Sequence, residues 1–130
     1  MNADSIQTLL RYRLDQARET LREANILLAN DAYRGAINRA YYAMFYALLA
    51  LLATKQLGTS RHSAAIALFD REFVKTGSFP ASLSQALHLA FERRQTHDYG
   101  EIMEADRASA EETLSGAQAF VDAVAAHLGA

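Results

Sequence analysis

The sequence predicts an all-α protein, an up-and-down bundle of four main helices plus one short helix. Apolar residues recur every three or four positions along most of the chain, which is the spacing of amphipathic helices. No stretch alternates between apolar and polar residues as a half-buried strand does. Of the 130 residues 51% are hydrophobic and one is proline, so the chain can bury a core as one domain of residues 1–130.

The first predicted helix runs from near the N-terminus to about Asn30. Asp4 and Gln7 have the spacing of a capping box at its start. Because the connection around Asn30 and Asp31 is very short, the first two helices should form an antiparallel hairpin. The apolar face of this helix consists of Ile6, Leu10, Leu14, Ala17, Leu21, Ala24 and Leu28.

The second predicted helix starts near Asp31, a residue type that caps helix N-termini well, and runs to about Gln56. The segment 58–60, Gly-Thr-Ser, then ends it. Residues 40–53 are all apolar, but this run is shorter than the roughly 20 residues that a bilayer-spanning helix needs. We therefore predict a buried helix of a cytoplasmic protein, with no membrane as a partner.

Three further helices complete the predicted bundle. A short third helix fits residues 62–75, with Gly77 near its C-terminal end. Pro80 suits the first position of a fourth helix, which reaches the segment 93–100. The last helix covers roughly residues 102–128, with one apolar stripe along its length.

Charge and composition limit the functions that the chain can have. The formal net charge of −2 gives no overall attraction to nucleic acid, so RNA would have to bind at a local basic patch. There is no cysteine, which excludes disulfides and thiolate metal sites. The sequence has no glycine-rich phosphate loop, paired catalytic carboxylates or Ser/His/Asp arrangement, and we expect neither a metal nor a cofactor.

The second helix is apolar on every side over most of its length, which is unusual in a small bundle. A helix of this kind is either central in its own chain or covered by a partner. We expect a homodimer to cover it, and the alternative is that the third and fifth helices of the same chain do so. The residues concerned are Tyr41, Tyr42, Met44, Phe45, Tyr46, Leu48, Leu49, Leu51 and Leu52.

The segment 93–100 gathers more groups that hold phosphate or move protons than any other part of the sequence. Metal-free RNA cleavage needs a base for the 2′-hydroxyl proton and a cation for the phosphate. The imidazole of His97 suits the first task, and the guanidinium of Arg93 or Arg94 suits the second. Arg93, Arg94 and His97 are therefore the candidate catalytic residues, and Arg93 lies four residues before His97 on one helix face.

Four residues are candidates for binding the same ligand: Arg39, Tyr42, His62 and Asp98. His62 follows Arg61 at the start of the predicted third helix, where a helix N-terminus attracts anions. A structural interpretation of the segment 93–100 stays open, because basic side chains in a last helical turn complement the helix dipole and Asp98 can cap the next helix. His88 and Glu92, four residues apart, fit a surface pair better than two metal ligands.

Three segments together resemble the HEPN family (higher eukaryotes and prokaryotes nucleotide-binding domains). They are residues 33–46, YRGAINRAYYAMFY; residues 60–63, SRHS, followed by Ile66 and Phe69; and residues 93–100, RRQTHDYG. These segments follow one another in the family's order and cover nearly the whole chain. The resemblance implies a single HEPN-like helical domain over residues 1–130.

The resemblance also implies a partner and a modification. HEPN proteins are often encoded beside a minimal nucleotidyltransferase as a toxin–antitoxin pair, and active members cleave RNA with an Arg and a later His that are separated by four to six intervening residues. Here Glu92 stands at the nearest such position, and Arg93 leaves three residues before His97. Arg94, Asp98 and Tyr99 match a branch that ends in Arg-x-x-x-Asp-Tyr, in which the antitoxin would adenylylate Tyr99.

Two functions follow as expectations. In the first, the chain is the toxin half of such a pair, binds nucleotide or RNA phosphate, and acts as a metal-independent endoribonuclease. In the second it is a non-enzymatic module that binds a nucleotide or a partner, as a substrate-presenting or assembly subunit of a nucleotidyltransferase.

Overall fold

The computed structural model describes residues 2–99 and 105–130, and it describes side chains for residues 2–95 and 105–130. Within this part of the chain every regular element is helical, and the predicted bundle of four long helices plus one short helix is confirmed. The elements are α1 (Ala3–Ala29), α2 (Tyr33–Ala53), α3 (His62–Phe69), a π-helical turn η1 (Asp70–Val74), α4 (Ala81–Tyr99) and α5 (Arg107–Leu128).

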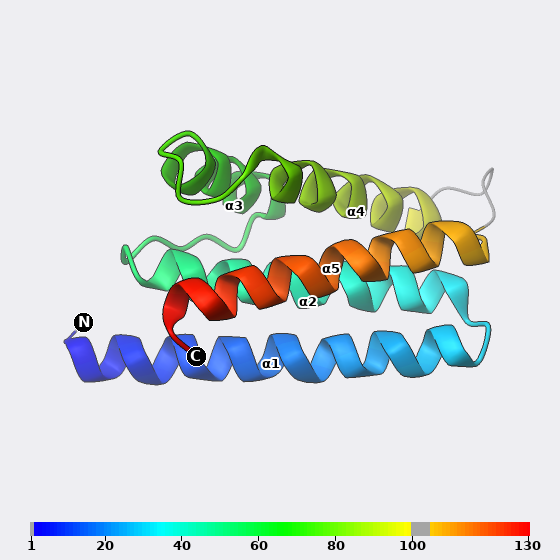
Figure 1. Cartoon of the computed structure of the whole chain (residues 1–130), viewed down its shortest axis with the longest axis horizontal. Helices are drawn as coiled ribbons and strands as arrows, with labels where there is room; N and C mark the ends of the chain where they lie inside the picture. The colour runs from blue at the N-terminus through cyan, green and yellow to red at the C-terminus, as the bar shows by residue number, and fades with distance from the viewer. Residues whose placement is uncertain (1, 100–104) are drawn as a thin grey trace.

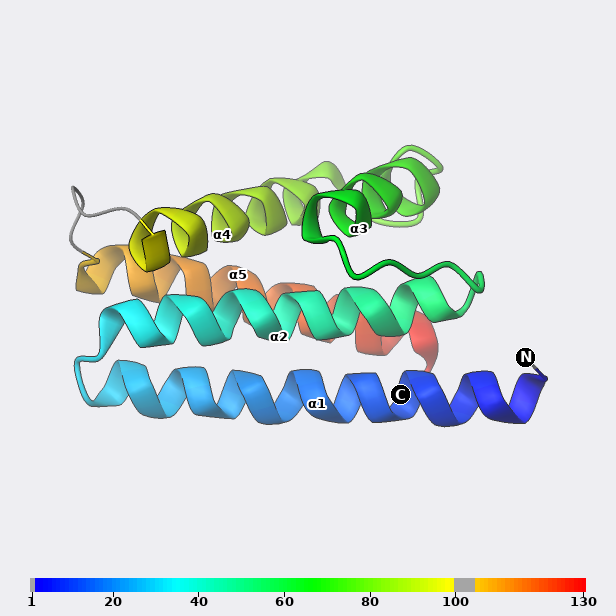
Figure 2. The ribbon, with the colours of Figure 1, turned by 180° about the vertical axis from the view of Figure 1, so that it is seen from behind.

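Helix α2 is the centre of the bundle. Figure 1 shows α1 and α2 as an antiparallel hairpin, with α5 beside α2 and with α3 and α4 on the side away from α1. Seen from behind, α2 again lies between α1 and the pair α3 and α4 (Figure 2). Residue contacts join α2 to α1, α5, α4 and α3.

The composition of α2 explains its central place. Six alanines that are buried let neighbouring helices approach closely, while Tyr41, Met44 and Leu48 fill the core between them. By length and composition α2 is a candidate membrane span, but 72% of its apolar window is buried inside the bundle, as expected of a core helix. One stripe of α2 is left half-buried, and it consists of Asn38, Arg39, Tyr42, Tyr46 and Leu49.

The hairpin that joins α1 and α2 differs from the prediction at both helix starts. Asn2, not Asp4, caps α1, and its side-chain oxygen accepts the backbone N–H of Ser5 at 2.8 Å. Ala32 occupies the N-cap of α2, because Asp31 adopts a left-handed conformation with φ of 61° that reverses the chain. The Asp31 carboxylate instead binds the Arg107 guanidinium, which ties this turn to α5.

Three other predicted boundaries also need correction. α2 ends at Ala53 rather than near Gln56. α5 begins at Arg107 rather than near residue 102, because Asp106 caps it by accepting the Ser109 N–H at 2.7 Å. Asp98 lies within the span of α4 and therefore does not cap the following helix.

The third predicted helix has nearly the expected extent but not a uniform geometry. Residues 62–74 are helical, one residue short of the predicted end, and their last turn is π-helical, with the Lys75 N–H bonded to the Asp70 carbonyl at 2.8 Å. Gly77 follows with φ of 86°, a conformation that glycine adopts without strain. Pro80 immediately precedes α4 instead of occupying its first position.

Candidate functional site: a cationic and aromatic cluster on α2

Arg94 of α4 points toward α2. It shares a helix face with Leu87 and Ala90, which are buried against the core, so its side chain crosses the α4–α2 boundary. Its Nη2 donates a hydrogen bond to the Tyr42 hydroxyl at 2.9 Å, and its guanidinium lies 5.3 Å from the centre of the Tyr42 ring. The arginine is half-buried, and its hydrogen bond to Tyr42 holds its positive charge at this surface.

Arg93 points toward α5, because one residue of an α-helix turns the side chain by about 100°. Its guanidinium donates to Thr113 Oγ1 at 3.1 Å and to the Ser109 carbonyl at 3.4 Å, and it forms an ion pair with Glu112 at 2.6 Å. The two candidate arginines are therefore held by different helices, and Arg94 is the one that the structure brings to Tyr42.

His62 lies beside the same tyrosine. As the first residue of α3 it stacks on Phe45, with ring centres 4.1 Å apart and planes inclined by 14°, and it meets Tyr42 edge-on at 5.7 Å. Its Nδ1 is 2.7 Å from the hydroxyl of Tyr41, which is wholly buried. Arg39, a further residue of α2, places its guanidinium 5.0 Å from the centre of the Tyr42 ring.

The electrostatic setting determines which hydrogen-bond donor His62 offers. Burial, and secondarily Tyr42, raises the pKa of Tyr41 far above its ordinary value, so this phenol keeps its proton. Because a buried hydroxyl hydrogen needs an acceptor, we infer that Tyr41 donates to His62 Nδ1, which lies 2.7 Å away. Burial, and secondarily the Arg94 charge, lowers the pKa of His62, so its ring is neutral near pH 7. A neutral imidazole that accepts at Nδ1 carries its hydrogen on Nε2.

We refer to Arg39, Tyr41, Tyr42, His62 and Arg94 as the Tyr42 cluster. It combines two guanidinium groups, an imidazole N–H donor and the phenol of Tyr42, which are groups that bind phosphate oxygens, with the buried phenol of Tyr41 behind His62. Asn38 accepts from Arg39 at 2.9 Å and 3.0 Å, and Glu23 lies 3.9 Å from the same guanidinium. The cluster thus brings together three of the predicted binding residues, Arg39, Tyr42 and His62, with Arg94.

The other predicted site residues are not part of this cluster as far as the structure describes them. The side chains of His97, Asp98 and Tyr99 lie outside the described residues, although α4 extends to Tyr99. His88 contacts Asp70 rather than forming a metal pair with Glu92, with its Nε2 2.8 Å from the Asp70 carboxylate. Among the residues with described side chains, no three His, Asp or Glu groups could hold a metal ion.

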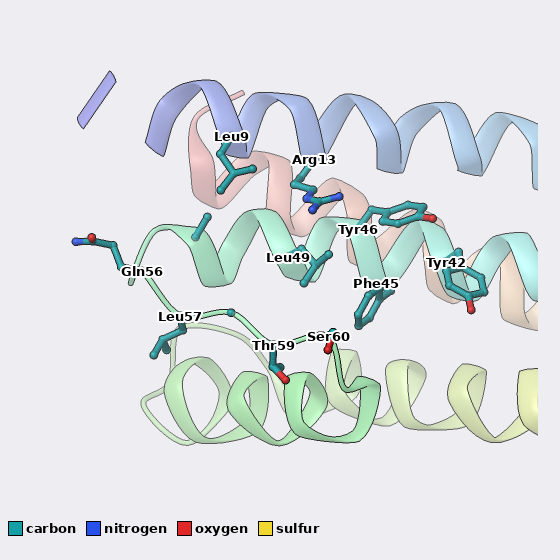
Figure 3. Close-up of a pocket in the computed structure, with 12 residues that line it drawn as sticks. Leu9, Arg13, Tyr42, Phe45, Tyr46, Leu49, Gln56, Leu57, Thr59 and Ser60 are labelled. Carbon is teal, nitrogen blue, oxygen red and sulfur yellow. The ribbon is translucent and has the colours of Figure 1, made fainter. Parts of the chain in front are cut away.

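Next to the cluster, α1, α2 and the segment that follows α2 enclose a groove of about 810 Å³. Figure 3 shows Leu9 and Arg13 of α1 on one side of it and Leu57, Thr59 and Ser60 on the other, with Tyr42, Phe45, Tyr46 and Leu49 of α2 between them. Sequence reasoning did not identify Arg13 or Tyr41 as functional residues. Arg13 belongs to no motif, and Tyr41 matters through its contact with His62.

Known proteins resemble this chain over most of its length. The family model described as "HEPN domain" matches residues 10–127. A "UPF0332 protein" of Thermotoga maritima is 41% identical over 118 residues, which are 91% of this chain and 89% of that protein. "Putative toxin MJ0142" of Methanocaldococcus jannaschii is 32% identical over 87% of this chain and 81% of its own. TT1696 from Thermus thermophilus, a crystal structure, aligns with a TM-score of 0.76 and 25% identity over 88% of this chain and 94% of its own.

Proposed function

Because this chain belongs to the HEPN family, we propose that it is a toxin-type HEPN protein that binds RNA or nucleotide phosphate at the Tyr42 cluster. The match over residues 10–127 confirms the resemblance noted in the sequence. Two relatives from Methanocaldococcus jannaschii, each 32% identical, are named "Putative toxin", which supports the toxin part of the proposal.

The position of Arg94 carries the phosphate part of the proposal. A chain with a net charge of −2 needs a local concentration of cations to bind RNA. Arg94 and Arg39 both lie within 5.3 Å of the centre of the Tyr42 ring, and the neutral His62 offers an N–H donor beside them. An incoming phosphate can accept from both guanidiniums and the imidazole without any of these groups changing its protonation state.

RNA binding at the cluster is tested with a fluorescent single-stranded RNA and anisotropy titrations at several salt concentrations. We expect Arg94→Gln to weaken binding by about tenfold or more, since charge-assisted hydrogen bonds contribute about 1.5–3 kcal/mol. The slope of log affinity against log salt should fall by about 0.7, the value for one phosphate contact on a single strand. Arg71→Gln, the same change of charge at an exposed position of η1, is the control. An Arg94→Gln protein that binds like the wild type would contradict the proposal.

RNA cleavage is a second candidate function, favoured by the toxin names of the relatives. In this candidate His97 takes the 2′-hydroxyl proton, the 2′-oxygen bonds to phosphorus, and the P–O5′ bond breaks as the 5′-oxygen takes a proton from water. A guanidinium of the same helix stabilises the phosphate meanwhile. Purified protein should then cut single-stranded RNA in the presence of a metal chelator, and His97→Ala should abolish the cut. Cleavage that survives this substitution would exclude His97 as the base, and binding without cleavage would favour the non-enzymatic module.

We also propose that the protein acts as a homodimer together with a minimal nucleotidyltransferase that adenylylates Tyr99. The partner and the modification rest on the family resemblance. α1, α4 and α5 cover most of α2 within one chain, and the proposed dimer leaves the Tyr42 cluster accessible. Analytical ultracentrifugation of the purified chain gives the molar mass in solution and so tests for the dimer. Mass spectrometry after incubation with ATP and such an enzyme measures the modification, which Tyr99→Phe should prevent.

A further inference from the structure

The groove beside the Tyr42 cluster has the size and lining of a site for a small planar ligand. Its volume of about 810 Å³ lies within the roughly 300–1,000 Å³ that is typical of ligand pockets. Most of its surface is apolar or aromatic, and a few polar groups stand among these side chains, including Arg13 and the hydroxyls of Thr59 and Ser60. Figure 3 shows these polar groups on opposite sides of the aromatic strip of α2.

The charge of the groove favours an electron-rich or anionic ligand. Of the described residues, those that line it include one arginine and neither aspartate nor glutamate. Arg13 donates to Gln16 at 3.0 Å and is half-buried, so its guanidinium has a fixed place at this wall. Nucleobases are planar, stack on aromatic rings, and present carbonyl and ring-nitrogen acceptors that suit guanidinium and hydroxyl donors.

Tyr42 connects the groove to the phosphate-binding groups. It lines one end of the groove, and at the same time its hydroxyl accepts from Arg94 and its ring lies near the Arg39 guanidinium. A ligand that leaves the groove at this end therefore meets two cations. This distribution, with aromatic rings along the groove and positive charge at one mouth, complements a base attached to a phosphorylated ribose.

We propose that this groove binds a nucleobase of single-stranded RNA, which stacks on Tyr46 while the adjoining phosphate lies at the Tyr42 cluster. The inference rests on the proposed phosphate site and adds the part of the substrate that the groove recognises. Stacking on an aromatic ring tolerates all four bases, so the site favours unpaired nucleotides over a particular sequence.

The test compares a short fluorescent oligoadenylate with an abasic ribose-phosphate oligomer of the same length. Wild-type protein should bind the oligoadenylate between about fivefold and a hundredfold more tightly, the range for stacking of one base. Tyr46→Ala should reduce this preference to about twofold or less and leave binding of the abasic oligomer unchanged. Tyr46→Phe keeps the ring and should behave like the wild type, and Tyr12→Ala removes an exposed tyrosine outside the groove as the matched control.

A second readout does not depend on truncating the ring. The chain has no tryptophan, so Tyr46→Trp places the single tryptophan of the variant in the groove, where it can be excited selectively over the tyrosines. Its emission should be quenched by oligoadenylate but not by the abasic oligomer, whereas Tyr12→Trp should respond equally to both. Circular dichroism melting of each variant establishes that the compared proteins are folded.

The outcomes separate this inference from the phosphate proposal. If both oligomers bind equally, and Arg94→Gln weakens both while Tyr46→Ala weakens neither, the groove does not bind a base and the phosphate site stands. If Arg94→Gln weakens neither oligomer, the phosphate proposal fails and the inference fails with it. If Tyr46→Ala dissociates a dimer in sedimentation without changing RNA affinity, the groove is an interface with a second copy, which also overturns the inference.

Discussion

The hydroxyl of Tyr41 lies 2.7 Å from Nδ1 of His62 and joins the centre of α2 to the first residue of α3. Because Tyr41 is wholly buried and keeps its proton, this contact decides which nitrogen of His62 accepts a hydrogen bond. The half-buried imidazole therefore carries an N–H donor on Nε2 although it has no charge near pH 7. Tyr41 is a positioning residue that acts through His62.

The first prediction concerns the tautomer of His62. In the wild type we expect the Nε2–H tautomer, because Tyr41 donates to Nδ1. Long-range ¹H–¹⁵N correlation spectra distinguish the two ring nitrogens directly. Tyr41→Phe removes the donor, and the spectra should then show a mixture of both tautomers. A predominant Nδ1–H tautomer in the wild type would contradict this account.

The second prediction concerns the effect of Arg94 on the pKa of His62. Burial is the larger cause of the lowered pKa, and the positive charge of Arg94 adds to it. Arg94→Gln should therefore raise the pKa of His62 but leave it below the ordinary value of about 6.5. NMR titration of the His62 ring protons measures the change. Arg93→Gln, which removes a charge facing α5, should leave this titration nearly unchanged.

The third prediction concerns stability against pH. The pKa of His62 is lower in the folded chain than in the unfolded chain, so the unfolded chain binds the proton more tightly. The contribution of neutral His62 to the free energy of unfolding should be complete above about pH 6.5. It should be lost progressively as the pH falls from there to the folded-state pKa. Urea unfolding of the wild type and of His62→Gln isolates this contribution, because the other titrating groups are common to both. The variant should show a shallower decrease over this window, and equal slopes would argue against the lowered pKa.

The fourth prediction concerns Arg93 and the contact between α4 and α5. Arg93 is 22% exposed and binds Glu112, Thr113 and the Ser109 carbonyl. Arg93→Ala should lower the free energy of unfolding by about 1–2 kcal/mol, since three polar contacts are lost at a partly solvated site. Glu112→Gln keeps a hydrogen-bond acceptor and should cost less than about 1 kcal/mol. Urea unfolding measures both, and an Arg93→Ala protein as stable as the wild type would refute a role in holding the helices together.

Helical periodicity in the sequence was enough to predict the fold. It was not enough to predict where the helices end or which way their side chains point. The apolar stripe of α1 and the buried run of α2 predict helices whatever the details of packing. The start of α2 was predicted at Asp31 from its residue type, but Asp31 binds Arg107, a residue 76 positions away. Tertiary contacts of this kind have no local signature in the sequence.

The candidate site, too, could be predicted from the sequence only in part. Arg93 and Arg94 are equivalent in the sequence, and only the packing of α4 against both α2 and α5 separates them. His62 could be assigned to a helix N-terminus from its position, but its partner Tyr41 depends on how α3 folds back over α2. The segment that carries His97 and Tyr99 is one of three that resemble the family, whereas the geometry of the described residues places the candidate site on α2.

The half-buried stripe of α2 has a consequence for how this protein tolerates mutation. One helix supplies both the packed interior and the outward-facing groups, and the two sets alternate along it: Tyr41 and Phe45 are buried, whereas Tyr42 and Tyr46 face outward. Random substitutions at 41 and 45 should be lost from a library because the protein is degraded. Substitutions at 42 and 46 should survive as abundant, folded molecules, so selection can reshape this surface without first rebuilding the interior.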